Sequence, residues 1–330
     1  MSVYLAPQQA RFFALLRLLA NGEFHSGSQL AQYLGISRAS VSNALHQAEN
    51  YGLQLYRVRG RGYCLSNPPQ WLDAELITHH LGQQARQFTV EISDCASSSN
   101  TLLLQRAAQG APSGSVLAVE WQSSGRGRLG RTWHSGLGNA LTFSLLWRFE
   151  RGLSALSGLS LAVGVALIRV LSALGISGAQ LKWPNDVLSK QGKLAGVLIE
   201  AQGDMLGPSA VVIGVGLNLF LPPALRSRID QPVSSLADLS NYKKMPERNY
   251  LLALILLELQ KILHTFAAQG FSALRAEWES HHALHKQSVQ LLLPDGSRVV
   301  GLAAGITENG ALMLETPQGT QIFHAGEATR

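Results

Sequence analysis

Apolar positions in the first fifty residues recur at helical spacing in three short blocks. We expect helices over 11–19, over 29–34 and from 38 to about 50. Each block is followed by a glycine that favours the end of a helix: Gly22, Gly35 and Gly52. Ser26 and Ser37 are placed to cap the second and third helices. Two short helices joined by a tight Gly-Ile-Ser turn predict a helix-turn-helix unit.

The third expected helix separates apolar side chains from small and polar ones. Its outer face carries Ala39, Asn43, His46 and Asn50. Such a face fits a DNA major groove, although an ordinary amphipathic helix has the same pattern. Two short strands, at 55–58 and 63–65, follow around an Arg-Gly-Arg-Gly turn, which is typical of a winged helix whose wing contacts phosphates. We therefore predict DNA binding through Arg38, Ala39, Ser42, Asn43, His46, Arg59 and Arg61.

A break at 66–70, Ser-Asn-Pro-Pro-Gln, separates this unit from a longer part of α+β character. We expect strands over 88–92, 115–122, 140–149, 180–182, 194–201 and 210–219. We expect helices over 100–109, 156–174 and 250–268, the last continued by 273–279. The strands cluster without regular helical crossovers, so a mixed or antiparallel sheet is favoured over a doubly wound one.

From residue 288 the pattern changes to short strands separated by Asp-Gly, Asn-Gly and Gln-Gly turns. These turns predict a small all-β barrel. The chain is therefore predicted to contain three domains, at 1–66, 67–284 and 285–330.

Composition and charge narrow the class of protein. With 330 residues, of which 46% are apolar and 15% charged, the chain is predicted to be globular. Residues 1–66 hold six arginines against two glutamates, so most of the formal charge of +6 lies there and indicates an anionic partner such as DNA. The two cysteines have no metal-ligand or redox spacing, which is typical of a reducing compartment.

Two segments, 153–176 and 251–266, are apolar enough to compare with membrane spans. Both contain charged or polar residues, so buried or amphipathic helices are favoured. The first ten residues lack a signal-peptide pattern. We therefore predict a soluble, cytoplasmic protein with no membrane partner.

The segment at 123–135, SSGRGRLGRTWHS, contains the Gly-x-Gly-x-x-Gly spacing of dinucleotide-binding folds. A dinucleotide site needs a helix directly after these glycines, whereas a tryptophan and another expected strand follow here. A nicotinamide site is therefore disfavoured. The glycines let the backbone approach a ligand, and Arg126, Arg128 and Arg131 can bind phosphate or carboxylate in bidentate fashion. The sequence predicts a cationic loop that closes over an anion.

Three further segments carry candidate chemistry. Lys182 and Lys193 flank a turn that would bring both ammonium groups and Asp186 to one site, where Asp186 would hold Mg²⁺ with phosphates. A plain Pro-Asn-Asp turn explains the same residues equally well. The serines at 97–99 precede a helix and either cap it or bind a small polar ligand. Gly214 and Gly216 interrupt an expected strand, which indicates close approach of a ligand or backbone.

In this order, these segments resemble the biotin protein ligases, and more closely the bifunctional bacterial type that also represses the biotin operon. The likeness covers nearly the whole chain: the winged helix, SSSN at 97–100, GRGRLGR-W at 125–133, KWPND at 182–186, KLAG at 193–196, GVGLN at 214–218 and the C-terminal barrel. It implies a ligase domain like that of class II synthetases and an SH3-like barrel. It also implies biotin and ATP as substrates, with Mg²⁺ and without a tightly bound redox cofactor. The implied partners are the biotin carboxyl carrier protein of acetyl-CoA carboxylase, operator DNA and, with adenylate bound, a second copy of the chain.

The family's reaction forms biotinyl-5′-adenylate and transfers biotin to a lysine of the carrier. Matching motif positions imply a set of biotin-binding residues: Ser98, Ser99, Asn100, Gln122, Arg126, Gly127, Arg128, Lys193, Gly214 and Gly216. Contacts to ATP or the adenylate are implied for Arg126, Arg128, Arg131, Lys182, Asn185 and Asn218. Arg128, Lys182 and Lys193 are the implied catalytic groups, and Asp186 is the implied metal ligand. Trp133 and Trp183 are expected to pack around the pocket.

Three residues depart from the family pattern. Leu129 stands where a further arginine is frequent, and Thr132 stands where lysine is common, so we expect altered coupling between ligand binding and dimerisation. Val233 lies near the position of an aromatic residue that covers the adenylate, so we expect weaker retention of the intermediate. One alternative is a biotin-sensing repressor without ligase activity. Another, a relative of the lipoate ligases, is disfavoured by the glycine-arginine loop and the winged helix.

Overall fold

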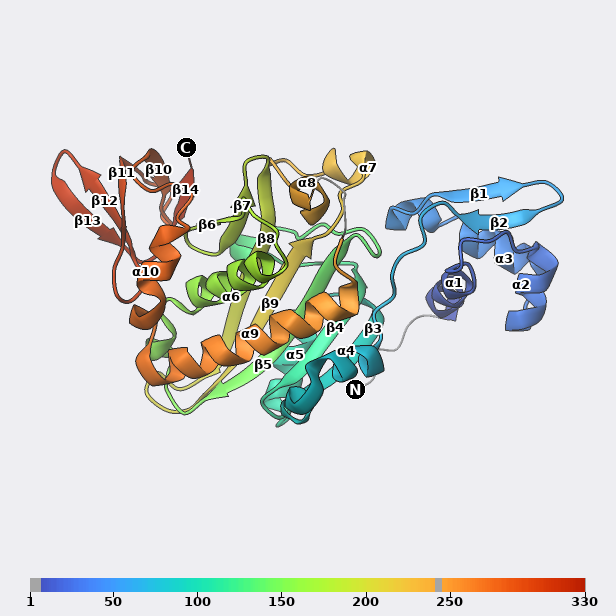
Figure 1. The fold of residues 1–330 in the computed structure, drawn as a ribbon, viewed down its shortest axis with the longest axis horizontal. Helices are drawn as coiled ribbons and strands as arrows, with labels where there is room; N and C mark the ends of the chain where they lie inside the picture. Colours follow the sequence, from blue (N-terminus) through green and yellow to red (C-terminus); the bar gives the residue numbers. More distant parts are fainter. Residues whose placement is uncertain (1–6, 241–244, 330) are drawn as a thin grey trace.

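The computed structural model describes residues 7–240 and 245–329, so residues 1–6 and 330 of the predicted terminal domains lie outside it. The described chain forms three successive parts (Figure 1). The first contains α1 (Pro7–Leu18), α2 (Gly27–Leu34), α3 (Arg38–Leu45), the 3₁₀ helix η1 (Ala48–Tyr51) and the antiparallel hairpin of β1 (Leu55–Val58) and β2 (Gly62–Leu65). Ser26 caps α2 with a complete capping box and Ser37 caps α3, as predicted.

The third helix ends earlier than predicted. Instead of continuing to about residue 50, it ends at Leu45, and η1 follows. Arg57 Nη2 donates to the Leu45 carbonyl at 3.2 Å, and Arg57 Nη1 lies 3.0 Å from His46 Nε2. The hairpin thus takes a carbonyl that a longer helix would use, a long-range contact that local periodicity does not reveal.

The central part contains a seven-stranded mixed sheet in the order β3-β4-β5-β9-β8-β7-β6, which confirms the predicted fold class. Only β3 and β4 pair in parallel. Its strands are β3 (Thr89–Ala96), β4 (Ser115–Gln122), β5 (Ala140–Phe149), β6 (Gln180–Lys182), β7 (Asp186–Ser189), β8 (Gly192–Gly203) and β9 (Ser209–Asn218). Sequence analysis missed β7, because its four residues follow the turn directly and lack a recognisable alternation.

Helices cover both faces of this sheet. The longer ones are α4 (Ala74–Leu81), α5 (Ser99–Ala108), α6 (Leu159–Ala173), α9 (Arg248–Gln269) and α10 (Ser272–Ser280). The shorter ones are η2 (Gly82–Gln87), η3 (Arg128–Gly130), η4 (Leu153–Leu156), α7 (Pro223–Arg226) and α8 (Leu236–Ser240). Val211 and Val212 belong to different apolar clusters, the first with α6 and α9 and the second with α5. Successive residues of a strand face opposite sides, so α5 lies on one face and α6 with α9 on the other.

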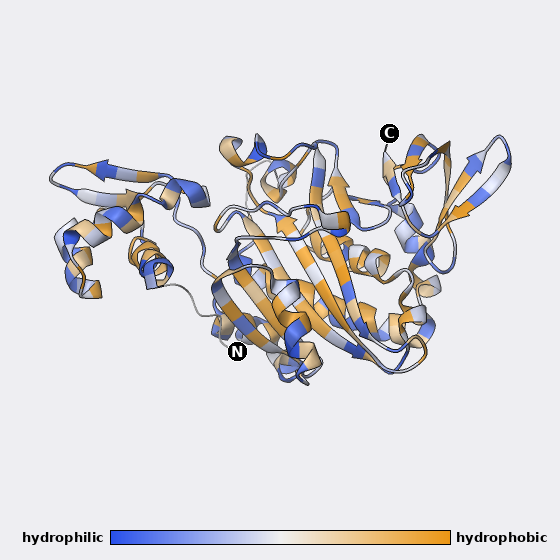
Figure 2. Ribbon diagram, turned by 180° about the vertical axis from the view of Figure 1, so that it is seen from behind, coloured by the Kyte–Doolittle hydropathy of each residue, from blue (hydrophilic) through white to orange (hydrophobic). Residues whose placement is uncertain are grey.

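The two apolar segments that were compared with membrane spans are core helices. Two helical segments, Leu153–Ala173 and Arg248–Gln269, are long and apolar enough to span a membrane, but both are largely buried. In Figure 2 the apolar colouring concentrates on the central strands and the helices against them. The hydrophobicity of these two helical segments therefore reflects their packing against the sheet, as predicted. The segment expected at 273–279 is helical as predicted, as α10, and Gly270, with φ 71°, separates it from α9.

The C-terminal part is a five-stranded antiparallel sheet in the order β13-β12-β11-β10-β14. It confirms the predicted all-β character of this region. Its strands are β10 (Ser288–Leu292), β11 (Arg298–Ile306), β12 (Leu312–Thr316), β13 (Gly319–Phe323) and β14 (Glu327–Thr329).

A buried ion pair fixes the chain between the winged helix and the central sheet. Arg248 Nη1 lies 2.8 Å from Glu120 Oε2, and both side chains are almost completely buried. Arg248 also donates to the carbonyls of Gln70 and Ala140, while Glu120 Oε1 accepts from the Leu72 backbone N–H at 2.6 Å. The linker is thus bound to β4 and to the start of α9.

Candidate active site

The predicted ligand residues gather in one pocket on the α5 face of the central sheet. The pocket is lined by nearly all of them: Ser98, Ser99, Asn100, Gln122, Arg126, Gly127, Arg128, Arg131, Lys182, Asn185, Asp186, Lys193, Gly214 and Gly216. Both expected tryptophans, Trp133 and Trp183, line it as well. These residues come from segments spread over 98–216 of the sequence, which supports a shared function.

Asn218 is the exception. Its buried side chain donates from Nδ2 to the carbonyls of Lys193, at 3.3 Å, and Ser234, at 3.0 Å. It does not line the pocket. Asn218 therefore links β9 to Lys193 of β8 and to the segment before α8, and it does not lie with the predicted ATP residues.

The inner end of the pocket presents neutral polar groups, beside the ion pair of Arg126 and Glu200. Ser98 caps α5, and the Ser99 backbone N–H donates to Gln122 Oε1 at 2.7 Å. This bond leaves Gln122 Nε2 as a donor. Ser144, a fully buried residue of β5, lies with its Oγ 2.7 Å from Ser99 Oγ and 2.6 Å from Asn100 Oδ1. A small ligand with both hydrogen-bond donors and acceptors suits this end.

Gly214 and Gly216 provide the space that lets the pocket exist. Both continue the face of β9 that carries Val212, so side chains there would project toward α5 and the loop. A Cβ on Gly214 would overlap Asn100 Oδ1, and one on Gly216 would overlap the Trp133 ring. A ligand or backbone was expected to approach these glycines closely, whereas the groups that do so here are the Asn100 and Trp133 side chains.

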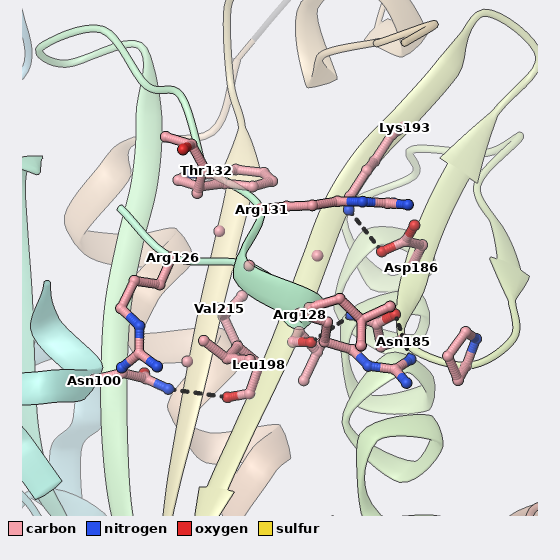
Figure 3. A pocket seen from close by; sticks show the side chains of 18 of the residues that line it. Asn100, Arg126, Arg128, Arg131, Thr132, Asn185, Asp186, Lys193, Leu198 and Val215 are labelled. Atoms are coloured by element: carbon pink, nitrogen blue, oxygen red, sulfur yellow. Dashed lines mark hydrogen bonds and ion pairs between the residues drawn. The ribbon is translucent and has the colours of Figure 1, made fainter. Parts of the chain in front are cut away.

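The glycine-arginine loop crosses the pocket, and its three arginines point in different directions (Figure 3). Arg126 pairs with Glu200 of β8 at 2.9 Å, and Arg128 donates to Asn185 at 3.3 Å. Arg131 forms a two-pronged ion pair with Glu327 of β14. Leu129 takes φ 54°, an unusual conformation for a non-glycine residue, and its side chain is 69% exposed.

The outer end of the pocket is cationic. Lys193 Nζ of β8 lies 2.8 Å from Asp186 Oδ1 of the neighbouring strand β7. Burial lowers the pKa of Arg128, and the nearby Asp186 and Glu327 partly offset this effect. The hydrogen bond from Arg131 lowers the pKa of Glu327, so that carboxylate stays ionised. Cations held at partly desolvated positions interact strongly with an anionic ligand.

The described residues offer little as a resident metal site. Within 7–240 and 245–329, no group of three or more histidine, cysteine or acidic side chains could hold a metal ion. Asp186 and Glu327 both line the pocket, and they are already paired with Lys193 and Arg131 respectively. One carboxylate can hold Mg²⁺ when nucleotide phosphates supply the other oxygens.

Sequence analysis missed two carboxylates that position the loop. Glu200 follows KLAG on the same strand, seven residues after Lys193, but nothing in a single strand indicates its partner. Glu327 lies 196 residues from Arg131. Neither pairing has a local signal.

The predicted DNA-binding residues lie together on the winged helix. Arg38, Ala39 and Asn43 are exposed on α3, with Ser42 half-buried, and Arg59 and Arg61 lie around the turn of the hairpin. The Arg61 guanidinium stacks on Phe24 at 4.1 Å from the ring centroid. His46 is exposed, but its Nδ1 contacts the Ser42 carbonyl at 2.7 Å and its Nε2 contacts Arg57. Both ring nitrogens of His46 are therefore already engaged.

Comparisons with known proteins cover all three parts. The biotin/lipoate A/B protein ligase family matches residues 92–218, an HTH domain matches 11–64, and the biotin protein ligase C-terminal domain matches 287–329. The bifunctional ligase/repressor BirA of Escherichia coli is 36% identical over 91% of this chain and 91% of its own length. The BirA of Bacillus subtilis is 29% identical over 93% of this chain and 94% of its own. The biotin protein ligase from Aquifex aeolicus, solved with biotin and ATP, has a TM-score of 0.62 and 26% identity and covers 73% of this chain and 97% of its own.

Proposed function

This chain belongs to the biotin protein ligase family, among the bifunctional ligase/repressors, and we propose that it attaches biotin to a carrier protein and represses transcription. The ligase reaction uses ATP and proceeds through biotinyl-5′-adenylate. The winged helix brings the repressor activity to operator DNA.

The observation that carries the proposal is the polarity of the pocket. Its inner end presents neutral groups, Ser99 and Gln122, whereas its outer end presents Arg128, Lys182 and Lys193. Biotin has a neutral ureido ring at one end and a carboxylate at the other. We infer that the ring lies at the inner end and that the carboxylate meets the phosphates of ATP among the cations.

In the first step, a carboxylate oxygen of biotin attacks the α-phosphorus of ATP, the bond to the β-phosphate oxygen breaks, and pyrophosphate leaves. The reactants bring together several negative charges. Lys193 is placed to exchange Asp186 for the biotin carboxylate, and Arg128 is placed to bind the adenylate phosphate. The protein needs no nucleophile of its own, because alignment and charge stabilisation lower the barrier.

In the second step, the amine of a carrier lysine attacks the carbonyl carbon of the mixed anhydride, the bond to the phosphate breaks, and AMP leaves. The amine loses a proton as the amide forms. We propose the biotin carboxyl carrier protein of acetyl-CoA carboxylase as this acceptor, in line with the M. tuberculosis relative named as its ligase, which is 36% identical over 70% of this chain.

For the metal, we propose that Asp186 holds Mg²⁺ only together with nucleotide phosphates. The ion would neutralise phosphate charge. Asp186 would then release Lys193 toward the biotin carboxylate.

For repression, we propose that the adenylate-bound chain forms a homodimer on operator DNA. The DNA contacts are the residues of α3 and the wing named above. We also retain the prediction that the protein works in the cytoplasm.

One experiment distinguishes a ligase/repressor from a biotin-sensing repressor without ligase activity. The full chain is incubated with labelled biotin, ATP and a carrier domain, with and without biotin-operator DNA. We expect label on the carrier, and a DNA shift that needs both biotin and ATP. Absence of label transfer would overturn the ligase assignment and leave a sensor, whereas absence of the adenylate-dependent shift would overturn the repressor assignment.

A further inference from the structure

Glu200 joins the glycine-arginine loop to the inner end of the pocket. Its Oε1 lies 2.9 Å from Arg126 Nη2, and its Oε2 accepts from Arg126 Nη1 at 3.3 Å and from Asn100 Nδ2 at 3.0 Å. The Glu200 side chain is 21% exposed, whereas Asn100 is buried. Figure 3 shows Arg126 directed toward Asn100 and away from Lys193.

The carboxylate fixes which way the Asn100 amide points. An ionised carboxylate can only accept hydrogen bonds, so it requires the NH₂ group of Asn100 on its side. The Leu198 carbonyl accepts from the same Nδ2 at 3.2 Å and enforces the same orientation. Asn100 Oδ1 therefore faces Ser144, and it can only accept.

This orientation determines the proton order of two hydroxyls. Ser144 has one hydroxyl proton, and the 2.6 Å contact with Asn100 Oδ1 requires it. The 2.7 Å contact between Ser144 Oγ and Ser99 Oγ then requires the Ser99 hydroxyl as the donor. Ser99 has no proton left for a ligand, so it presents only lone pairs to the pocket that it lines.

We propose that Glu200 is a positioning residue that makes Ser99 Oγ an obligate hydrogen-bond acceptor, and thereby selects ligands with an N–H donor at the inner end. The ureido ring of biotin has two such N–H groups, so the inference rests on the proposed function and deepens it. Arg126, in this role, holds the Glu200 carboxylate in its orientation. A ligand with a carbonyl or ether oxygen at this point would face two sets of lone pairs and bind poorly.

The test is a double-mutant cycle on biotin affinity in the full chain, measured by calorimetry. Glu200→Met keeps the side-chain length and removes the acceptor, so we expect biotin to bind about tenfold more weakly, the effect of ~1.4 kcal/mol. Ser99→Ala should weaken biotin to a similar degree. Because Glu200 acts through Ser99, the double variant should bind biotin no more weakly than Ser99→Ala alone.

Measurements other than biotin affinity distinguish a positioning role of Glu200 from a general loss of protein structure. The KM for ATP and the melting temperature of the ligand-free protein should stay unchanged in Glu200→Met, while the KM for biotin rises. Glu200→Gln retains an oxygen that can accept from Asn100, so it should recover most of the biotin affinity. Glu91→Met removes a comparable glutamate, paired with Arg106 at 2.8 Å outside the pocket, and should leave biotin binding unchanged.

The outcomes are distinct. If the wild-type chain does not bind biotin, the proposed function fails. If it binds biotin and the losses in Glu200→Met and Ser99→Ala simply add, or Glu200→Met binds biotin normally, the proton-order inference is wrong. Should Glu200→Met fail to fold, the same cycle with Glu200→Gln decides, since its smaller loss must also vanish in the Ser99→Ala background.

Discussion

Arginine side chains differ in burial and in the number of their partners between two regions of this protein. At the linker, Arg248 is 3% exposed and is bound by Glu120 and two backbone carbonyls. In the glycine-arginine loop, Arg126 and Arg131 are about half exposed, and each is held by one carboxylate. A buried pair cannot be broken without leaving a desolvated charge, whereas an exposed pair exchanges partners at little cost.

The chain thus combines a buried ion pair at the linker with exposed ion pairs at the pocket. The linker pair holds the start of the ligase part against β4, the strand that also carries Gln122. The loop pairs keep the arginines near the pocket while leaving them available to an incoming anion. Substitutions in these regions are therefore expected to change the free energy of unfolding by very different amounts.

The largest effect is expected at the linker. Arg248→Met leaves Glu120 buried without its counter-ion and should lower the free energy of unfolding by about 3–5 kcal/mol. Urea denaturation of the full chain measures it. Replacing both partners, by Glu120→Met with Arg248→Met, should lower the free energy of unfolding by less than the single change does. Lys261→Met, which breaks a pair between an exposed lysine and Glu258, should lower it by under ~1 kcal/mol. A single variant as stable as the wild type would contradict the contrast.

A buried group without a counter-ion should respond to pH. Burial lowers the pKa of His282 from 6.5 to about 4, with a smaller effect of His285 in the same direction and an opposing one from Glu279. The unfolded chain binds the proton more tightly, so this contribution to stability is complete above pH 6.5 and is lost as the pH falls toward 4. The loss amounts to roughly 3 kcal/mol at ~1.4 kcal/mol per pH unit.

His282→Phe keeps a ring against Trp278, whose centroid lies 4.7 Å away, and should remove this part of the pH dependence. Urea midpoints of the wild type and the variant at pH 7 and pH 4.5 measure the difference. His324→Gln, at an exposed position whose charge does not contribute to the pKa shift of His282, is the control. Parallel pH profiles for wild type and His282→Phe would exclude the assignment.

A smaller effect is expected where the loop meets β14. Glu327→Gln weakens the pair with Arg131 and should change the free energy of unfolding by under ~1 kcal/mol. The loop loses its attachment to the C-terminal part, so trypsin should cut at its arginines several times faster. Glu315→Gln, an exposed change on β12, should leave the cleavage rate unchanged. Unchanged cleavage in Glu327→Gln would show that this pair does not hold the loop.

The smallest change in stability accompanies a large change in function. Arg128→Ala removes a 3.3 Å hydrogen bond to Asn185 and should leave the fold intact. The same change should release biotinyl-adenylate prematurely, because the cation proposed for its phosphate is gone. Adenylate retained on the protein after gel filtration measures this. Retention equal to that of the wild type would reject the role of Arg128.

The sequence alone determined the elements with strong local signals. Capping serines and terminal glycines located α2 and α3, Asp-Gly and Asn-Gly turns located the C-terminal strands, and apolar runs located β4 and β5 with their observed ends. Nearly every ligand residue predicted from the motifs lines the pocket. These features depend on backbone preferences and on close backbone approach, which glycine, proline and capping residues record locally.

Only the tertiary structure decided which charges meet. Arg57 shortens α3, Asp186 faces Lys193, Arg131 reaches Glu327, and Asn218 turns away from the pocket. An ion pair needs only two side chains within reach, and sequence separation says nothing about which pairs the fold brings there. Local motifs therefore predicted the residue types of the pocket. The ion pairs made by Glu120, Glu200 and Glu327 depend instead on how the chain packs.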